Sequence, residues 1–373
     1  MERLSHWLAE LGSQAKAYRF DVAPNPCVGA AVLAGDRLIA RGFHEVWGRE
    51  HAEINALAAA RASGVPPSRW EALLVTLEPC SSRGKTPPCV EDILASGIRR
   101  VVVGEVDPDP RHRGAGLRAL RDAGVEVELL EGAARLSDVA PHFVAWNSDD
   151  RIRRPRPWMI AKWAQTRTGQ LVPPPDVGGG RWISGAEARA EVQTLRGRVD
   201  AIMSSVGTVL RDDPRFTVRP PGDRSRPPLR VILDSRLRTP PNAKLFDPPG
   251  PAESGGEVHI LCVGGEDEGR HRALVAAGAT VHELHAATDD GVSLRDAHTW
   301  MWERGLRRVV LEAGPRLLTH HLQSGFVDQV RIYTGPVNGG EGLSMADWLT
   351  RLVFRERLDR ECGADAVLEA FLR

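Results

Sequence analysis

The chain has 373 residues, which is long for one ordinary domain and suits two or three. Its composition, 42% hydrophobic and 26% charged, is typical of a globular protein and excludes a disordered or fibrous one. The 49 Lys and Arg residues balance the 49 Asp and Glu residues, so no overall basic field favours nucleic acid or an anionic membrane.

The N-terminal segment 1–11 predicts an amphipathic first helix and not a signal peptide. No apolar run reaches the ~18 residues of a membrane-spanning helix. The five cysteines, an odd number, argue against a disulfide framework and for a reducing compartment. We therefore expect a cytoplasmic protein without membrane or nucleic-acid partners.

Strand-like and helix-like segments alternate up to residue 150. Short apolar runs predict strands, and runs rich in Ala and Leu predict helices. In chain order we expect a strand pair at 27–33 and 38–43, a helix at 51–62, a strand at 71–77, a helix at 89–96, a strand at 100–104, a helix at 117–123 and a strand at 125–130. This alternation predicts a layered α/β domain with a largely parallel sheet.

A stretch rich in arginine and proline at 148–158 interrupts the pattern. No aromatic residue interleaves with its arginines, so we interpret it as a solvated linker and not as a nucleic-acid patch. A boundary at this linker divides the chain into two predicted domains, 1–150 and 151–373. In the second we expect strands at 159–164, 201–205, 230–234, 258–263, 280–284, 308–312 and 329–333, and helices at 186–198, 270–277, 294–304 and 316–324.

The strongest chemical signal is the set His51, Glu53, Cys80 and Cys89 in the first domain. One histidine and two cysteines supply the three protein ligands of a catalytic zinc, which keeps a fourth position for water and lowers its pKa toward ~7. Glu53 could then move the proton from that water to a leaving nitrogen, and we expect the helix N-terminus to help keep it ionised. This arrangement is that of the zinc nucleobase deaminases.

Other interpretations of these residues stay open. Cys80 and Cys89 could be small buried side chains, and His51 an ordinary helix-start histidine. A structural zinc is the stronger rival, but it normally takes a fourth protein ligand and would leave Glu53 without a role. A glycine pattern at 114–119 fits a dinucleotide fingerprint, yet it follows a loop and not a strand end, so we do not interpret it as a nucleotide site.

Together the motifs resemble those of one enzyme family. In the first half they are NPCVG at 25–29, GFH at 42–44, HAE at 51–53 and above all LEPCSSRGKTPPC at 77–89. In the second half they are WIS at 182–184, LR at 195–196, GTVLRDDPRFTVR at 207–219, LDS at 233–235 and EAG at 312–314. The chain is similar, over nearly its whole length, to the bifunctional pyrimidine deaminase/reductases of riboflavin biosynthesis.

The resemblance implies an N-terminal cytidine-deaminase-like three-layer domain followed by a dihydrofolate-reductase-like α/β domain. It implies zinc-dependent hydrolytic deamination of a diamino-ribosylamino-pyrimidinone 5′-phosphate, and then reduction of the ribosyl side chain to ribityl by NADPH. Members of the family form homo-oligomers, and we expect the same of this chain.

The resemblance also implies a role for each motif residue. Zinc would be held by His51, Cys80 and Cys89, with Glu53 as the catalytic residue. The implied substrate contacts are Asn25, His44 and Lys85 in the deaminase and Arg196, Arg219 and Glu312 in the reductase. The implied NADPH contacts are Trp182, Thr208, Asp212, Ser235 and Gly314.

Physical chemistry supports several of these roles. Arg196 and Arg219 could make charge-assisted bonds to one phosphate monoester. Gly314 opens a helix whose N-terminus suits a diphosphate. For the adjacent acids Asp212 and Asp213 we favour a turn or helix cap over acid/base chemistry.

Three residues of the second domain, Thr168, Gly180 and Ala313, depart from the family's usual pattern. They leave open a deaminase whose reductase domain is degenerate or altered. Two further alternatives are a non-catalytic nucleotide-binding protein and a nucleic-acid base deaminase, and the neutral charge balance disfavours the latter.

Overall fold

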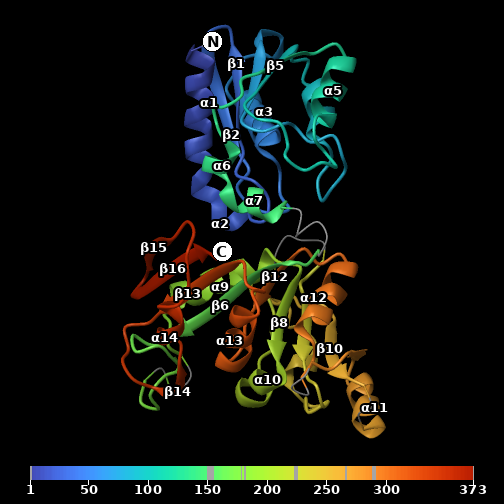
Figure 1. Cartoon of the computed structure of the whole chain (residues 1–373), viewed down its shortest axis with the longest axis vertical. Coiled ribbons are helices and arrows are strands. Elements are labelled where there is room, and N and C mark those ends of the chain that lie inside the picture. Colours follow the sequence, from blue (N-terminus) through green and yellow to red (C-terminus); the bar gives the residue numbers. More distant parts are fainter. Residues whose placement is uncertain are drawn as a thin grey trace. The chain divides into compact units, whose positions relative to one another are not determined.

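The structure is a computed structural model that describes residues 2–148, 155–177, 179, 182–221, 226–264, 267–287 and 291–372. The chain divides into two units, Met1–Arg154 and Pro155–Arg373, and each has its own main sheet (Figure 1). The predicted linker at 148–158 falls largely on residues 149–154, which lie outside the described residues, as does the boundary predicted at residue 150. Among the described residues, no helix is both long enough and apolar enough to cross a membrane.

The first unit contains a five-stranded sheet of order β2-β1-β3-β4-β5. Its main elements are α1 (Glu2–Ala15), α2 (Arg19–Val22), β1 (Gly29–Ala34), β2 (Arg37–Phe43), α3 (Ala52–Ala62), β3 (Ala72–Val75), α4 (Cys89–Ala95), β4 (Arg100–Val103), α5 (Ala115–Asp122), β5 (Glu126–Leu129), α6 (Leu136–Val139) and α7 (Pro141–Trp146). Every element predicted for this half of the chain is present, with ends shifted by a few residues.

The prediction of a largely parallel sheet is wrong for this unit. The pairs β3–β4 and β4–β5 are parallel, but β1 is antiparallel to both of its neighbours, β2 and β3. A tight turn at Gly35 (φ 57°) reverses the chain into β2, and α3 then leads past β1 to β3. The connection from β2 through α3 to β3 passes over β1, so β2 and β3 are parallel to each other. β1 lies between them and runs in the opposite direction.

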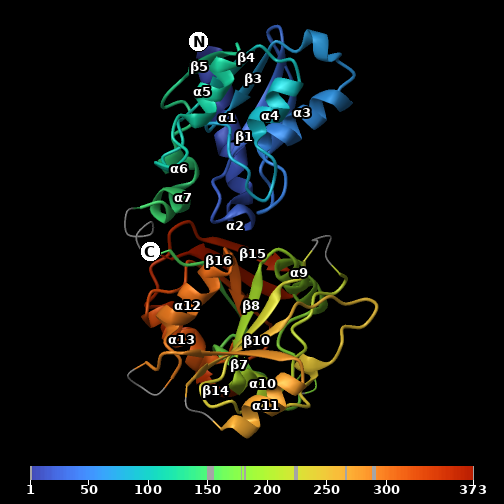
Figure 2. The same cartoon turned by 90° about the vertical axis from the view of Figure 1, so that its right-hand side faces the viewer.

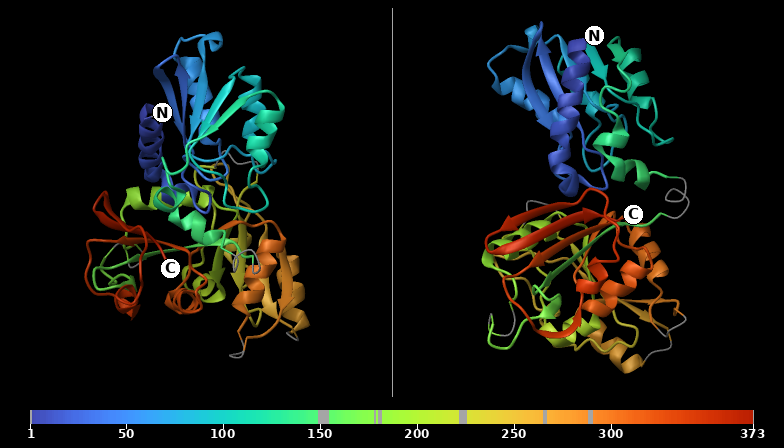
Figure 3. Two further views of the ribbon diagram at one scale, coloured as in Figure 1. Left: turned by 45° about the horizontal axis from the view of Figure 1, so that its top comes forward. Right: turned by 60° about the vertical axis from the view of Figure 1, so that its left-hand side comes forward.

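Apolar side chains cover both faces of this sheet. On β1, Ala30 and Val32 belong to the cluster that includes α3, α4 and α5, whereas Ala31 and Leu33 belong to the cluster that includes α1. Successive strand residues point to opposite faces, so a strand buried on both faces is apolar throughout. The result is a three-layer α/β/α unit, whose helices are seen on both sides of the sheet in Figures 2 and 3.

Helix α3 packs very closely on β2. A Cβ atom added to Gly42 would lie 2.1 Å from the amide nitrogen of Ala56 and 2.5 Å from the carbonyl oxygen of Ala52. Only glycine allows this approach. Because α3 begins directly after His51, the contact fixes the position of the helix N-terminus that carries His51 and Glu53.

The second unit contains a nine-stranded sheet of order β11-β10-β9-β8-β12-β6-β13-β16-β15. Its elements are β6 (Trp158–Gln165), β7 (Gln170–Val172), α9 (Ala186–Gly197), β8 (Ala201–Ser205), α10 (Val206–Asp212), β9 (Leu229–Leu233), β10 (Val258–Val263), α11 (Glu268–Ala276), β11 (Ala279–Leu284), α12 (Leu294–Glu303), β12 (Arg308–Leu311), α13 (Pro315–Gln323), β13 (Gln329–Thr334), β14 (Glu341–Ser344), α14 (Ala346–Leu349), β15 (Leu358–Cys362) and β16 (Asp365–Phe371). The predicted strands and helices are all present, but β7, α10, β14, α14, β15 and β16 were not predicted.

The large sheet is parallel from β11 to β13, and β16 runs antiparallel to both of its neighbours, β13 and β15. From β8 the chain proceeds outward through β9, β10 and β11, and then returns to place β12 between β8 and β6. The strand order therefore changes direction between β8 and β12. In open α/β sheets, ligands bind outside the carboxyl ends of the strands at such a point.

Candidate active sites

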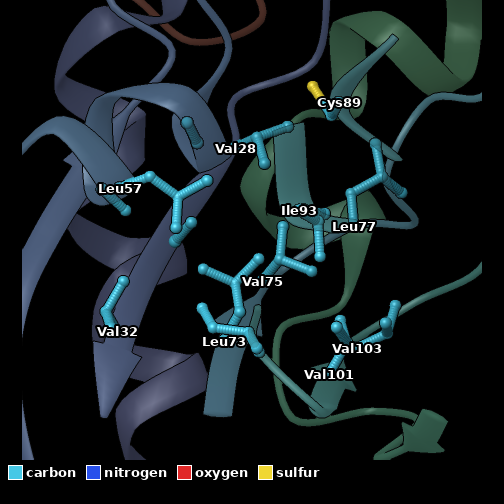
Figure 4. Packing of buried hydrophobic residues seen from close by; sticks show 14 of the residues in the cluster. Val28, Val32, Leu57, Leu73, Val75, Leu77, Cys89, Ile93, Val101 and Val103 are labelled. Atoms are coloured by element: carbon cyan, nitrogen blue, oxygen red, sulfur yellow. The ribbon is translucent and has the colours of Figure 1, made fainter. Parts of the chain in front are cut away.

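The three candidate zinc ligands come from two helix starts and one loop of the first unit. His51 has an extended backbone and immediately precedes α3, and Cys89 is the first residue of α4. Cys80 lies in the loop that follows β3. Figure 4 shows the Cys89 sulfur at the border of the apolar cluster formed by residues such as Leu77 and Ile93.

The donor atoms of these residues fit one tetrahedral ion. The Nδ1 atom of His51 lies 3.6 Å from Sγ of Cys80 and 3.3 Å from Sγ of Cys89. Zinc–nitrogen and zinc–sulfur bonds of about 2.0 and 2.3 Å place tetrahedral N and S ligands roughly 3.5 Å apart. Within the described ranges, this is the one group of three or more potential ligands so closely spaced. Three ligands without a fourth suit a catalytic zinc better than a structural one.

The charges of the site favour deprotonated sulfur. Hydrogen bonds from the Cys89 thiol, and from His51, lower the pKa of Cys80, although burial opposes this. The same bond to Cys80, together with burial, raises the pKa of Cys89. The pair thus already contains one favoured thiolate, and binding of zinc would release the proton held by the other.

Glu53 lies in the first turn of α3 and is only 3% exposed. Burial raises its pKa, and this outweighs the lowering effects of His51 and of the backbone hydrogen bond. The backbone hydrogen bond at the start of α3 lowers the pKa of Glu53, as expected for a helix N-terminus, but desolvation of the carboxylate is the larger effect. A raised pKa brings a carboxyl closer to neutral pH, which suits a group that takes up and returns a proton.

Two of the three expected deaminase substrate residues lie beside the zinc ligands. Nδ1 of His44 donates to the carbonyl oxygen of Glu50 (3.0 Å), which leaves Nε2 to accept from the Asn25 amide (3.2 Å). The His44 ring meets the His51 ring edge-on, with centroids 5.1 Å apart. Asn25 is itself held through its carbonyl oxygen by His142 (2.9 Å).

Lys85, the third expected contact, lies over the ring of Trp47, with Nζ 3.9 Å from the ring centroid. Trp47 follows His44 in the loop between β2 and α3. The contact therefore links the loop that carries Cys80 to the loop that carries His44. Sequence reasoning missed Trp47, which is buried; the signal available in the sequence is a tryptophan three residues after His44.

In the second unit, Glu312 joins two cations. Nε and Nη2 of Arg196 donate to its two carboxylate oxygens at 2.6 and 3.0 Å, and Nζ of Lys162 lies 3.5 Å away. Burial raises the pKa of Glu312, but the neighbouring Arg196 and Lys162 outweigh this effect and hold the pKa at about 2. Sequence reasoning missed Lys162, whose signal is a lysine within the buried strand WMIAKWAQ.

Arg196 and Arg219 have separate partners in this structure. The Arg196 guanidinium also donates to the carbonyl oxygen of Thr217 (3.0 Å), whereas Arg219 is half exposed and pairs with Glu253 (3.2 Å). Convergence of both guanidinium groups on one phosphate thus stays a prediction.

Several expected NADPH residues lie at the carboxyl ends of β8, β9 and β12. Ser205 caps α10, and Oγ1 of Thr208 accepts the Gly314 amide (3.3 Å) at the start of α13. A Cβ atom at Gly314 would meet nothing within 4 Å, so there is open space at this helix N-terminus. Ser235 follows β9, and its Oγ accepts the Val292 amide (3.1 Å).

The other two expected NADPH residues are on the surface. Trp182 is 54% exposed, and the Arg189 guanidinium lies 5.0 Å from its ring centroid. Asp212 is an exposed residue at the end of α10. Asp213 has a left-handed backbone and accepts the Lys244 amide (2.8 Å), which agrees with the predicted turn.

Comparison with known proteins agrees with both halves of the chain. Residues 2–105 match the family described as "Cytidine and deoxycytidylate deaminase zinc-binding region", and residues 157–348 match "RibD C-terminal domain". The chain is 34% identical over 362 residues to "Riboflavin biosynthesis protein RibD" of Aquifex aeolicus, covering 95% of each chain. It is 28% identical over 381 residues to the protein of the same name from Escherichia coli K12, covering 97% of this chain and 98% of that one.

Solved structures give the same result over the full length. The structure of RibD from Acinetobacter baumannii is 27% identical with a TM-score of 0.67, covering 100% of this chain and 99% of that one. A diaminohydroxyphosphoribosylaminopyrimidine deaminase/5-amino-6-(5-phosphoribosylamino)uracil reductase from Thermotoga maritima is 26% identical with a TM-score of 0.66 and 99% coverage of each chain. The predicted pairing of a cytidine-deaminase-like domain with a second α/β domain, here one that matches the RibD C-terminal domain, is confirmed. The chain belongs to the RibD family of riboflavin biosynthesis proteins.

Proposed function

We propose that the chain is a bifunctional enzyme that performs two consecutive steps of riboflavin biosynthesis. The first unit would hydrolyse an amino group of the diamino-ribosylamino-pyrimidinone 5′-phosphate, and the second would reduce the ribosyl group to ribityl with NADPH. The observation that carries the proposal is the zinc-sized triangle of His51, Cys80 and Cys89 next to the buried Glu53.

In the deaminase, zinc when bound supplies Lewis-acid activation of the attacking water. Glu53 takes up a proton at its carboxylate and delivers it to the leaving nitrogen, while a C–O bond forms, the C–N bond breaks and ammonia leaves. His44 and Asn25, fixed by their mutual hydrogen bond, orient the pyrimidine ring. Lys85 offers a mobile cation for the phosphate.

In the reductase, NADPH would supply a hydride for the carbon of the opened ribosyl imine, whose nitrogen would take up a proton. Arg196, Lys162 and Glu312 provide a buried charged surface for the polar substrate, with Arg219 nearer to solvent. The start of α13 at Gly314, together with Thr208 and Ser235, would hold the phosphates and ribose of the cofactor. Trp182 and Asp212 complete the proposed cofactor contacts.

The proposal is tested on the purified full chain with three measurements. We expect about one zinc ion per chain, ammonia release from the diamino substrate, and stoichiometric NADPH oxidation with the deaminated intermediate. Absence of zinc or of ammonia release would overturn the deaminase. The same experiment with a single-stranded oligonucleotide should release no ammonia.

A second candidate is a deaminase with a degenerate or altered reductase. Oγ1 of Thr168 accepts a hydrogen bond from the Gly339 amide (2.8 Å), and Ala313 packs against the core of the second unit. Gly180 lies outside the described residues. NADPH that stays unoxidised at saturating intermediate would favour this candidate.

We also propose, on the family resemblance, a preference for NADPH over NADH, a homo-oligomeric assembly and a cytoplasmic location. Initial rates with each nucleotide measure the preference, and light scattering measures the assembly. Fractionation of the producing cells measures the location.

A further inference from the structure

Glu78 lies two residues before the zinc ligand Cys80, and its side chain is only 7% exposed. Its carboxylate accepts hydrogen bonds from four backbone amides. Oε2 accepts those of Asp107 (3.1 Å) and Gly114 (2.9 Å), and Oε1 accepts those of Gly116 (2.8 Å) and Leu117 (3.4 Å). Three of these amides belong to the start of α5, where a helix leaves its own donors unpaired. The carboxylate thus occupies the N-terminus that the glycine pattern at 114–119 would otherwise offer to a phosphate.

The backbone around Glu78 is held against the same segment. The Glu78 amide donates to the carbonyl oxygen of Glu105 (2.8 Å). A Cβ atom at Gly116 would lie 1.9 Å from the carbonyl oxygen of Pro79, so α5 directly contacts the peptide that precedes Cys80. The position of Pro79, and with it the start of the Cys80 loop, is therefore set by α5.

Cys80 is held on its other side by α4. The Cys89 amide donates to Sγ of Cys80 (3.3 Å), and the Val90 amide donates to its carbonyl oxygen (3.3 Å). Cys80 thus lies between two anchors, α4 and the Glu78–α5 junction. Of the two, only the second depends on a buried charge.

We propose that Glu78 is a positioning residue for the zinc centre. By fixing the peptide before Cys80, its carboxylate holds Sγ of Cys80 at the spacing from His51 and Cys89 that a single tetrahedral ion requires. This inference rests on the proposed zinc site. Outer residues that hold ligands in place typically contribute about 10- to 100-fold to metal affinity.

The four amides explain why a carboxylate is needed. Both oxygens of an ionised carboxylate accept hydrogen bonds, whereas a glutamine side chain has one acceptor oxygen and one NH₂ donor. In Glu78→Gln, the NH₂ group would face two N–H donors whichever way the amide is turned. At least two of the four bonds would be lost, and the Cys80 loop would be free to shift.

The test is the zinc affinity of full-length Glu78→Gln, measured by competition with a chromophoric chelator. We expect affinity to fall by at least about tenfold relative to the unsubstituted chain. Replacement of zinc by cobalt gives a second measurement, since thiolate-to-cobalt absorption reports the geometry of the two cysteine ligands, Cys80 and Cys89. Neither measurement depends on turnover.

Glu105→Gln is the matched control. It removes one negative charge from the same segment. Among the described residues, the Glu105 side chain accepts a hydrogen bond from one backbone amide, that of Leu136 (3.1 Å), and a glutamine oxygen can accept it too. We expect its zinc affinity and cobalt spectrum to equal those of the unsubstituted chain. The calorimetric transition of the first unit verifies that this unit is folded in each variant.

Two failures are distinguishable. If the unsubstituted chain binds zinc and Glu78→Gln binds it equally well, Glu78 is only a helix cap and the inference is wrong. If the unsubstituted chain binds no zinc, the proposed function fails. Should Glu78→Gln not fold, Glu78→Asp keeps the charge but is one methylene shorter, and unchanged affinity in that variant also overturns the inference.

Discussion

Two buried glutamates of this chain have pKa values that move in opposite directions. Burial raises the pKa of Glu53, whereas Arg196 and Lys162 overcome the effect of burial and hold the pKa of Glu312 at about 2. A raised pKa makes a carboxyl easier to protonate, and a lowered pKa keeps it anionic. The two environments thus match a proton carrier in the deaminase and a fixed negative charge in the reductase.

We predict that Glu53→Gln loses ammonia release but keeps its zinc. The amide cannot carry the proton, and general acid/base groups contribute about 10²- to 10⁴-fold to rate. Metal analysis and an ammonia assay on the same preparation measure both effects. Glu91→Gln, an exposed carboxylate in the first turn of α4, is the control and should behave like the unsubstituted chain. An unchanged rate in Glu53→Gln would show that another group moves the proton.

We predict that the second unit loses stability in acid through Glu312. Its pKa is lowered from 4.5 to about 2, so its stabilising contribution is present above pH 4.5 and disappears as the pH falls toward 2. The shift corresponds to an upper limit of about 3 kcal/mol. Urea unfolding of the second unit at pH 7 and pH 3 measures the effect. At pH 7, Glu312→Gln should be less stable than the unsubstituted chain, since Arg196 and Lys162 lose their partner. Between pH 7 and pH 3 it should lose less stability than the unsubstituted chain does. An equal loss in the two proteins contradicts the prediction.

The zinc residues could be predicted from sequence because the chemistry itself restricts their identity and spacing. Glu78 and Lys162 could not, since each acquires its role from partners distant in the chain. Glu78 accepts hydrogen bonds from amides of α5, and Lys162 donates a hydrogen bond to Glu312. A charged residue inside an apolar run indicates that a partner exists, but not which one.

At the scale of the elements, periodicity predicted the central strands well and failed for the last two. Strand β15 reads LDREC and β16 reads DAVLEAF, and both contain charged residues that an alternating or apolar pattern does not explain. In the structure, Glu369 of β16 is buried in an ion pair with Arg331 of β13, and Arg360 of β15 pairs with Glu191 of α9. Because these pairings are long-range, local propensity contains no signal for them.

We predict that Gly42→Ala displaces α3 and weakens the zinc site with it. The new Cβ would overlap backbone atoms of α3 at 2.1 and 2.5 Å, which no side-chain rotation can relieve. Overpacking of this kind costs about 1–3 kcal/mol or more. We expect a lower thermal midpoint of the first unit and a lower zinc affinity. Gly84→Ala, where the added atom meets nothing within 4 Å, is the control; equal zinc affinity in the two variants would mean that β2 does not position His51.

At the scale of the whole molecule, each unit has its own apolar core, and the residues assigned to each site come from one unit only. The zinc ligands belong to the first unit, and the Glu312 cluster and the proposed NADPH contacts belong to the second. A ligand stabilises the folded unit that binds it by mass action. Zinc and NADPH are therefore expected to act on different unfolding events of one chain.

We predict two calorimetric transitions that respond to separate ligands. Removal of zinc with a chelator should lower the midpoint temperature of the first unit alone. NADPH should raise the midpoint temperature of the second unit, because at 100 times its dissociation constant it stabilises the folded unit by about 2.7 kcal/mol. Chelation should also stop ammonia release while NADPH oxidation with the deaminated intermediate continues. In Cys80→Ala the chelator should have little effect on either midpoint, because the zinc site lacks a ligand. A single transition that shifts with both ligands would show that the two units unfold together, and a chelator effect on NADPH oxidation would show that the reductase depends on the metal.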